Sequence, residues 1–167
     1  TTLNLSINDT NKYVMPPFSL LMTSINKSSY LKEVERQNET NALKLENILD
    51  EYGVTGKVVS FKTGPIITLF EFQPSAGVKT SKVIGLATDI ARSMSSISAR
   101  ISSQPGKNSI GIEIPNNKRQ NVYLGDLLQD EKFNRSNKGL ILALGKSVSG
   151  EKVYTDLERM PHLLIAG

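Results

Sequence analysis

Two runs rich in β-branched and aromatic residues, 58–61 and 66–72, lie only four residues apart in this chain of 167 residues. Between them stands Lys62-Thr63-Gly64-Pro65, in which glycine and proline favour a turn. Runs this short and this close predict two antiparallel strands joined as a hairpin. An isolated hairpin is marginally stable in water, so the neighbouring segments must extend it and cover one of its faces.

Apolar residues recur at helical spacing on both sides of this hairpin. Before it, from Asn38 to the helix stop at Gly53, one face carries Ala42, Leu45, Leu49 and Tyr52. After it, the same spacing joins Val83, Ala87, Ile90, Ala91 and Met94. Two more strands are predicted at 97–101 and 110–114 around a Pro-Gly turn. The order αββαββ predicts a compact α+β domain over residues 38–117, with both helices on one face of a four-stranded sheet.

The regions on either side of this domain are less regular. Thirteen of the first 30 residues are Ser, Thr or Asn, so we interpret residues 1–37 as a linker. Its Pro16-Pro17 pair begins a stiff stretch, 16–21, that is either a spacer or a segment that docks on a neighbouring surface. Residues 118–167 predict an unfinished second unit with short strands at 122–124, 140–144 and 163–166 and a helix at 126–128.

Composition excludes several kinds of chemistry. The chain has no cysteine and a single histidine, His162, so it has neither disulfides nor a multi-histidine metal centre. Its carboxylates are scattered, and we interpret Asp89 and Glu113 as surface charges and His162 as a positional residue at the entrance of a strand. No apolar run is long enough to span a bilayer, so the chain is expected to be soluble. Because it begins with Thr1 and ends at Gly167 directly after an apolar run, we interpret it as a piece of a longer protein. We predict no catalytic residue and no metal site in it.

Positive charge is concentrated in the middle of the chain. Residues 54–119 hold nine basic and three acidic side chains, a balance that suits either a nucleic-acid backbone or a merely solvated surface. The candidate phosphate-binding cations are Lys79, Lys82, Arg92, Arg100, Lys107, Lys118 and Arg119. Stacking on single strands is disfavoured, because the predicted strands use Phe61, Phe70 and Phe72 for core packing.

The last residues form an apolar run that ends in a glycine, Leu163-Leu164-Ile165-Ala166-Gly167. Such a run is typical of a buried strand in a parallel sheet. It is also how a nucleotide-binding P-loop of pattern GxxxxGK[ST] begins, and Gly167 fits its first glycine. A strand that simply ends in glycine remains the alternative.

The motifs together resemble the FtsK/SpoIIIE family of DNA translocases. The first group reads LENILDEYGVTGKVV at 45–59, TGPIITLFEF at 63–72 and GVK at 77–79. The second reads RI at 100–101, PGK at 105–107, GIEIPN at 111–116, ALGK at 143–146, SG at 149–150 and MPHLLIAG at 160–167. The similarity extends from the Pro-Pro segment at residue 16 to residue 167.

This resemblance implies a motor that pumps double-stranded DNA through a homo-hexameric ring with ATP and Mg²⁺. Residues 38–117 correspond to its α domain, which forms the ring, and residues 118–167 to the start of its RecA-like β domain, ending at Gly167. Its DNA-backbone candidates here are Arg100, Lys107, Lys118 and Arg119. The family acts at the bacterial division septum as the cytoplasmic portion of an inner-membrane protein, with recombinases and division proteins as partners.

Two alternatives to this function remain at the level of sequence. One is a self-contained protein-interaction domain with no DNA role, and the other is the equivalent domain of another ring ATPase, such as a conjugation or secretion motor. Because the P-loop lysine is absent, we expect no bound nucleotide and no ATP hydrolysis by these 167 residues. We also expect residues 118–167 to be less ordered than residues 40–115, since unpaired strands need neighbours.

Overall fold

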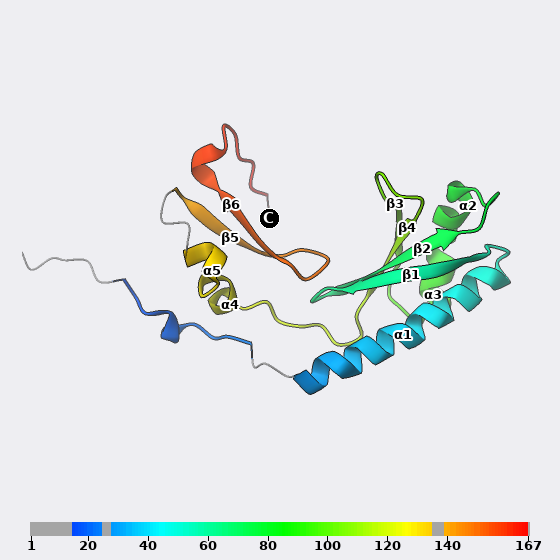
Figure 1. The fold of residues 1–167 in the computed structure, drawn as a ribbon, viewed down its shortest axis with the longest axis horizontal. Helices are drawn as coiled ribbons and strands as arrows, with labels where there is room; N and C mark the ends of the chain where they lie inside the picture. Colours follow the sequence, from blue (N-terminus) through cyan, green and yellow to red (C-terminus); the bar gives the residue numbers. More distant parts are fainter. Residues whose placement is uncertain (1–14, 25–27, 135–138, 167) are drawn as a thin grey trace, which may run out of the picture.

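The computed structural model describes residues 15–24, 28–134 and 139–166. Its first part consists of a 3-10 turn, η1 (Phe18–Leu20), followed by α1 (Ser28–Glu51), β1 (Gly56–Thr63), β2 (Ile67–Pro74), α2 (Thr80–Gly85), α3 (Ala87–Ser93), β3 (Arg100–Ser103) and β4 (Ile110–Pro115). Its second part consists of α4 (Leu124–Leu128), α5 (Glu131–Asn134), β5 (Ile141–Lys146), β6 (Lys152–Asp156) and η2 (Leu157–Arg159) (Figure 1). The predicted α+β class and the αββαββ order are confirmed, with the second helix in two pieces.

The first part is built on a four-stranded antiparallel sheet in the order β1-β2-β4-β3. The predicted hairpin is β1–β2, and the second predicted hairpin, β3–β4, adds to it through β4. Residues that pair across antiparallel strands point to the same face. The row Phe61, Phe70, Ile112 and Ile101 therefore lies on one face, while the next row, Lys62, Leu69, Glu113 and Arg100, lies on the other.

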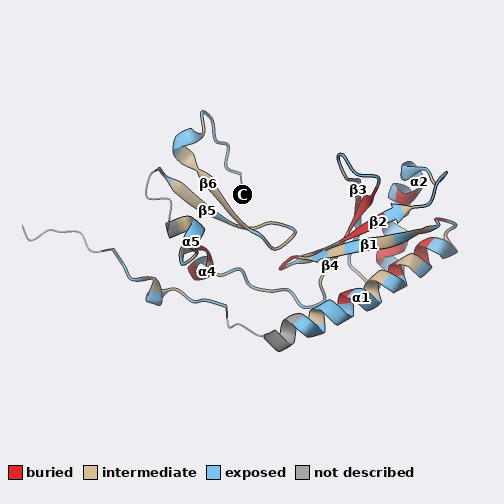
Figure 2. Ribbon diagram, viewed as in Figure 1, coloured by how far each residue is buried: buried red, intermediate tan, exposed pale blue. Residues whose placement is uncertain are grey.

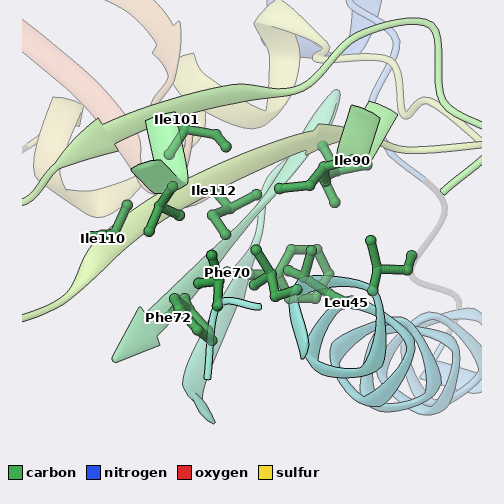
Figure 3. Close-up of a cluster of buried hydrophobic side chains, with 12 residues drawn as sticks. Leu45, Phe70, Phe72, Ile90, Ile101, Ile110 and Ile112 are labelled. Carbon is green, nitrogen blue, oxygen red and sulfur yellow. The ribbon is translucent and has the colours of Figure 1, made fainter. Parts of the chain in front are cut away.

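The helices cover the first of these faces. Leu45 and Leu49 of α1 and Ile90 of α3 are fully buried and belong to one core with Phe70, Phe72, Ile101, Ile110 and Ile112 (Figure 3). Burying a large apolar side chain contributes about 1.5–3 kcal/mol, so this cluster is the main source of stability. Figure 2 shows the buried residues concentrated in this first part, whereas β5 and β6 are of intermediate exposure.

Helix boundaries differ from the sequence prediction in two places. Helix α1 begins at Ser28, so the predicted start at Asn38 was wrong. The predicted single helix around Val83–Met94 is interrupted at Leu86, whose backbone (φ −87°, ψ 5°) separates α2 from α3. Gly85 stands just before the break, and a glycine inside a helix costs about 1 kcal/mol relative to alanine.

Strand boundaries also required correction. Ile97 is 88% exposed and precedes β3, because Ser95 adopts a positive φ of 56° and Ser96 bonds locally to the carbonyl of Ser98. Residues 122–124 do not form the predicted strand: Leu124 already begins α4, which confirms the predicted helix at 126–128. The predicted strand at 140–144 is confirmed as β5, but its antiparallel partner β6 was missed.

The apolar run at 163–166 is not a strand in the described chain. Leu164 is 92% exposed and Ile165 81% exposed, and neither pairs with a described strand. A strand forms only when a neighbour satisfies its backbone groups, and the described residues supply none here. Gly167 lies outside the described residues.

Candidate nucleic-acid interface

The face of the sheet opposite α1 and α3, termed here the open face, carries polar and charged side chains. Its rows across the strands are Lys57 and Gln73; Ser60, Glu71, Gly111 and Ser102; and Lys62, Leu69, Glu113 and Arg100. Lys62 and Arg100 are exposed at the two edges of the third row. The open face therefore presents cations at its two edges, with the carboxylates of Glu71 and Glu113 between them.

A buried carboxylate lies near the centre of the open face. Glu71 is only 7% exposed, and both of its oxygens accept hydrogen bonds from Lys107 Nζ, at 2.8 and 3.0 Å. The Lys107 ammonium holds the pKa of Glu71 below its usual range, against the opposing effect of burial. Gly111 lies across from Glu71 on β4, and its lack of a side chain leaves space for Gln104: a Cβ at this position would lie 2.2 Å from Gln104 Nε2. Lys107 is thus a structural partner of Glu71 in the free protein.

Two other predicted cations are also held by this chain. Lys82 donates to the carbonyl of Gly53 at 2.8 Å, at the end of α1. Arg92 donates to the hydroxyl of Tyr52 and, at 3.0 Å, to Asp89, and these contacts raise the pKa of the guanidinium. The interpretation of Asp89 as a surface charge therefore holds, with Arg92 as its partner.

The four preferred DNA-backbone candidates do not form one cluster. Lys107 is in the β3–β4 turn, whereas Arg100 begins β3 and lies across from Glu113, near the far end of β4. Glu113 lies three residues along β4 from Ile110, where the β3–β4 turn ends, so roughly 10 Å of strand separates the Arg100 pair from this turn. Lys118 and Arg119 follow β4 at the Arg100 end and are exposed.

Lys57 and Lys62 also lie on the open face, although neither is among the cations predicted from the sequence. They are five positions apart, and in a regular strand an odd separation puts side chains on opposite faces. A register shift between Val58 and Ser60 returns both lysines to the same face. A bulge of this kind leaves no clear signal in an alternating pattern, so the sequence alone could not have paired them.

The aromatic residues behave as predicted. Phe70 is 1% exposed and Phe72 fully buried, while Phe61 packs against the core with its ring centre 6.1 Å from that of Phe70. None of these three rings is available to stack on a base. The prediction against a single-strand binder is thus supported by the packing.

The described residues hold neither a candidate metal cluster nor a membrane-spanning helix. They contain no group of three acidic or histidine side chains that could hold a metal ion. Within the same ranges, no helix is long and apolar enough to cross a bilayer. His162 is exposed next to the apolar run at 163–166, and no described contact gives it a chemical role.

A cavity of about 250 Å³ lies between α1 and the connector that follows β4. Its lining includes Asn38 and Thr68, over a floor that includes Phe70. Both polar side chains already have partners: Asn38 donates to Thr63 Oγ1 at 2.7 Å, and Thr68 donates to Asn116 Oδ1 at 2.7 Å. Ligand pockets usually measure about 300–1,000 Å³, so we assign no ligand here.

The second part of the chain touches the first at the β1–β2 turn. Gly64 and Pro65 are buried there, and a Cβ on Gly64 would lie 2.1 Å from the carbonyl oxygen of Val148 in the β5–β6 turn. The connector is fixed to the same turn, because the Gln120 amide donates to the Pro65 carbonyl at 2.8 Å. The open face and the second part are therefore attached to one rigid element, the β1–β2 hairpin.

Known proteins provide a direct comparison. Residues 15–116 match the FtsK alpha domain family, and residues 123–167 match the FtsK/SpoIIIE family. A protein of Azospirillum brasilense named DNA translocase FtsK is 45% identical over 163 residues, which is 98% of this chain and 26% of the relative. Proteins of the same name from Brucella suis and Rhizobium meliloti are 52% identical over 77% of this chain and 43% identical over 96% of it, covering 15% and 18% of the relatives.

This chain thus spans about a quarter or less of each of these relatives. The FtsK alpha domain match nevertheless covers well over half of the chain and coincides with the four-stranded sheet and its helices. The FtsK/SpoIIIE match coincides with α4 to η2 and the terminal apolar run. The chain belongs to the FtsK family and carries its alpha domain followed by the start of the FtsK/SpoIIIE segment.

Proposed function

We propose that this chain is the ring-forming portion of an ATP-dependent translocase of double-stranded DNA. The observation that carries the proposal is the similarity over nearly the whole chain to proteins named DNA translocase FtsK. In this function a homo-hexameric ring surrounds the duplex and moves chromosomal DNA during cell division and chromosome segregation. The four-stranded sheet and its helices supply the rigid body from which such a ring is built.

The open face is the surface we propose for contact with the DNA backbone. Binding to the phosphate backbone is independent of base sequence and depends mainly on positive charge. Exposed cations on a rigid sheet are therefore sufficient for such binding. Arg100 and Lys62 occupy the two edges of one row and are exposed, and Arg119 extends the charge beyond β4. Lys107, although bound to Glu71, remains half exposed and can offer its charge to a phosphate. Lys118 completes the proposed set.

ATP and Mg²⁺ belong to the proposed motor, but the residues present here do not form their site. A P-loop cradles phosphates with backbone amides between two glycines and uses a lysine and a hydroxyl that follow them. Of that pattern the sequence holds only Gly167. The preceding residues 163–166 are exposed and unpaired. We therefore derive no nucleotide chemistry from this chain.

The proposed setting follows the family resemblance. The chain would lie on the cytoplasmic side of an inner-membrane protein at the division septum, where recombinases of chromosome dimer resolution and division proteins are its partners. The runner-up function is an assembly domain of another ring ATPase without a direct DNA role. One observation favours it: Lys82, Arg92 and Lys107 are all held by internal partners, which reduces the charge available for phosphates.

Duplex DNA binding separates the two proposals. The 167-residue chain and its Lys62→Ala/Arg100→Ala variant are titrated with labelled duplex at two salt concentrations, with fluorescence anisotropy as the readout. Each lost phosphate contact is expected to reduce the slope of log K against log salt by about 0.9. Lys44→Ala is the matched control, because Lys44 is exposed on α1, which covers the opposite face.

Light scattering on the same samples reports assembly. Salt-sensitive binding that weakens in the double variant and persists in the control supports the DNA-facing role. An oligomer that shows no binding at either salt concentration contradicts that role and favours the assembly domain.

A further inference from the structure

The segment before α1 lies against α4, which belongs to the other part of the chain. Gly125 of α4 is buried beneath it, and a Cβ at this glycine would lie 2.5 Å from the carbonyl oxygen of Met22, 3.0 Å from Thr23 Cγ2 and 3.2 Å from Leu21 Cβ. The backbone amide of Ser24 then donates to Asp126 Oδ1 at 3.0 Å. Of the stretch 16–21, which the sequence predicts to be either a spacer or a docking segment, Leu21 takes part in these contacts, whereas Leu20 is 73% exposed.

The contact has the form of peptide recognition by an extended chain. The main chain at Met22 comes closest to the Gly125 position, with Leu21 Cβ and Thr23 Cγ2 beside it. Leu21 is half-buried, whereas the side chains of Met22 and Thr23 are exposed, so the contact is made mainly by the backbone. Only glycine leaves room for that approach at position 125.

Helix α4 is itself attached to β6. Lys152 of β6 donates to the carbonyl of Asp126 at 2.7 Å and to the carboxylate of Asp130 at 2.6 Å. Tyr154 of β6 donates from its hydroxyl to the carbonyl of Leu127 at 2.9 Å. The docked segment is thereby connected to β6 and to the apolar run that follows it.

We propose that α4 is an intramolecular docking site for residues 21–24, so that the alpha domain is enclosed in a loop whose two ends are both fixed on the second part of the chain. One end is the docked segment, joined to α1 through residues 25–27. The other is the connector 116–123, which runs from β4 into α4.

Hydrogen exchange on the whole chain tests the docking. Gly125→Ala places a methyl group against the Met22 carbonyl, and the Ser24 amide is expected to exchange at least about tenfold faster, the effect of losing one hydrogen bond of about 1.4 kcal/mol. Gly85→Ala is the matched control, since a Cβ at this other helical glycine meets nothing within 4 Å. The Ile112 amide in the core serves as an internal check that each variant is folded.

A Ser24 amide that exchanges equally fast in the original chain and in Gly125→Ala, with Ile112 protected in both, would overturn the docking. That outcome leaves duplex DNA binding, the test of the proposed function, untouched. Conversely, a protected Ser24 amide in a chain that never binds DNA supports the docking while the DNA-facing role fails.

Cross-linking establishes whether the segment docks within its own chain. The protein has no cysteine, so Met22→Cys/Leu124→Cys introduces the only two thiols at exposed positions of the docked segment and α4 and keeps Asp126 in place; a short bifunctional maleimide joins them if they are close. A cross-linked monomer on a denaturing gel supports the proposal, and each single-cysteine variant controls for chance links. A cross-linked dimer as the main product, or no product, contradicts docking within one chain.

Discussion

Asn116 holds the β1–β2 turn through Gly64: its side-chain amide donates to the Gly64 carbonyl at 2.9 Å. The Asn116 backbone amide donates to the Ile66 carbonyl at 2.8 Å, and its Oδ1 accepts from the hydroxyl of Thr68. One residue thus bonds to both sides of a turn that lies about fifty positions earlier in the chain. The same turn contacts the second part of the protein at Val148, so Asn116 fixes the position from which that part projects.

Replacing this residue is expected to lower stability. In Asn116→Ala the buried hydroxyl of Thr68, which is 2% exposed, loses its acceptor and the Gly64 carbonyl loses a donor. The free energy of unfolding should fall by about 1–3 kcal/mol, the cost of a buried polar group left without a partner. Urea denaturation measures it, and Asn117→Ala at the exposed neighbouring position is the control. Equal losses in the two variants would contradict the role assigned to Asn116.

Alanine at Gly64 should act on the junction between the two parts. A methyl group 2.1 Å from the Val148 carbonyl oxygen forces the β5–β6 turn away or strains the hairpin, at a cost of about 1–3 kcal/mol. Gly85→Ala should have the opposite sign and stabilise by up to about 1 kcal/mol, because α2 gains a better helix former in open space. Thermal unfolding of both variants checks the pair of signs. A Gly64→Ala chain as stable as the original would show that the contact does not constrain the fold.

Acid should destabilise the alpha domain through Glu71. Because the Lys107 ammonium lowers the pKa of Glu71 in the folded state, the pair stabilises the protein fully above the unfolded value of about 4.3. That contribution is lost as the pH falls through the lower, folded pKa. Lys107→Met should reduce stability at pH 7 by roughly 1 kcal/mol and make the acid dependence shallower.

Urea unfolding from pH 7 to pH 3 measures this dependence. The Lys107→Met variant should lose less stability across that interval than the original chain. Parallel curves for the two proteins would mean that another carboxylate dominates the acid response.

Hydrogen exchange should be slower in residues 40–115 than in residues 118–167. The buried cluster around Phe70, Phe72 and Ile112 lies entirely in the first range, whereas the residues of β5 and β6 are only partly buried. Amides exchange through local opening, which is easier where fewer apolar contacts must break. Comparable protection in β5 and β4 would contradict this expectation.

The 167-residue chain should show no metal-dependent ATP hydrolysis above a buffer blank. Its sequence ends at the first glycine of the P-loop pattern and lacks the lysine that binds the outer phosphates. A coupled assay with Mg²⁺ and duplex DNA is the measurement. Hydrolysis that survives a second purification step would require a nucleotide site elsewhere in the chain.

Much of the alpha domain could be predicted because its signals are local. The strict alternation of Ile110, Ile112 and Ile114 predicted a strand with one buried face, and all three are buried. The helical spacing of Leu45 and Leu49 predicted the packed face of α1 in the same way. Prediction failed at Ile97 and at 163–166, where apolar residues suggested strands that have no hydrogen-bonding neighbour among the described residues.

The proposed interface was only partly predictable. The seven candidate cations were identified by type, but nothing local indicated that Lys107 would bind Glu71, 36 positions away. Lys57 and Lys62 were missed because a bulge changes the alternation between them. Docking of residues 21–24 on Gly125 likewise depends on a contact about a hundred positions distant.

Spacing, turn residues and ordered motifs were enough to establish the elements and the family, because periodicity and turn chemistry act over a few residues. Strand order, the partner of each charge and the attachment of the second part came from the folded structure. The physical reason is that these relationships depend on which segments become neighbours in space. The order β1-β2-β4-β3 puts Glu71 of β2 beside the strand whose turn carries Lys107, and no local pattern encodes that adjacency.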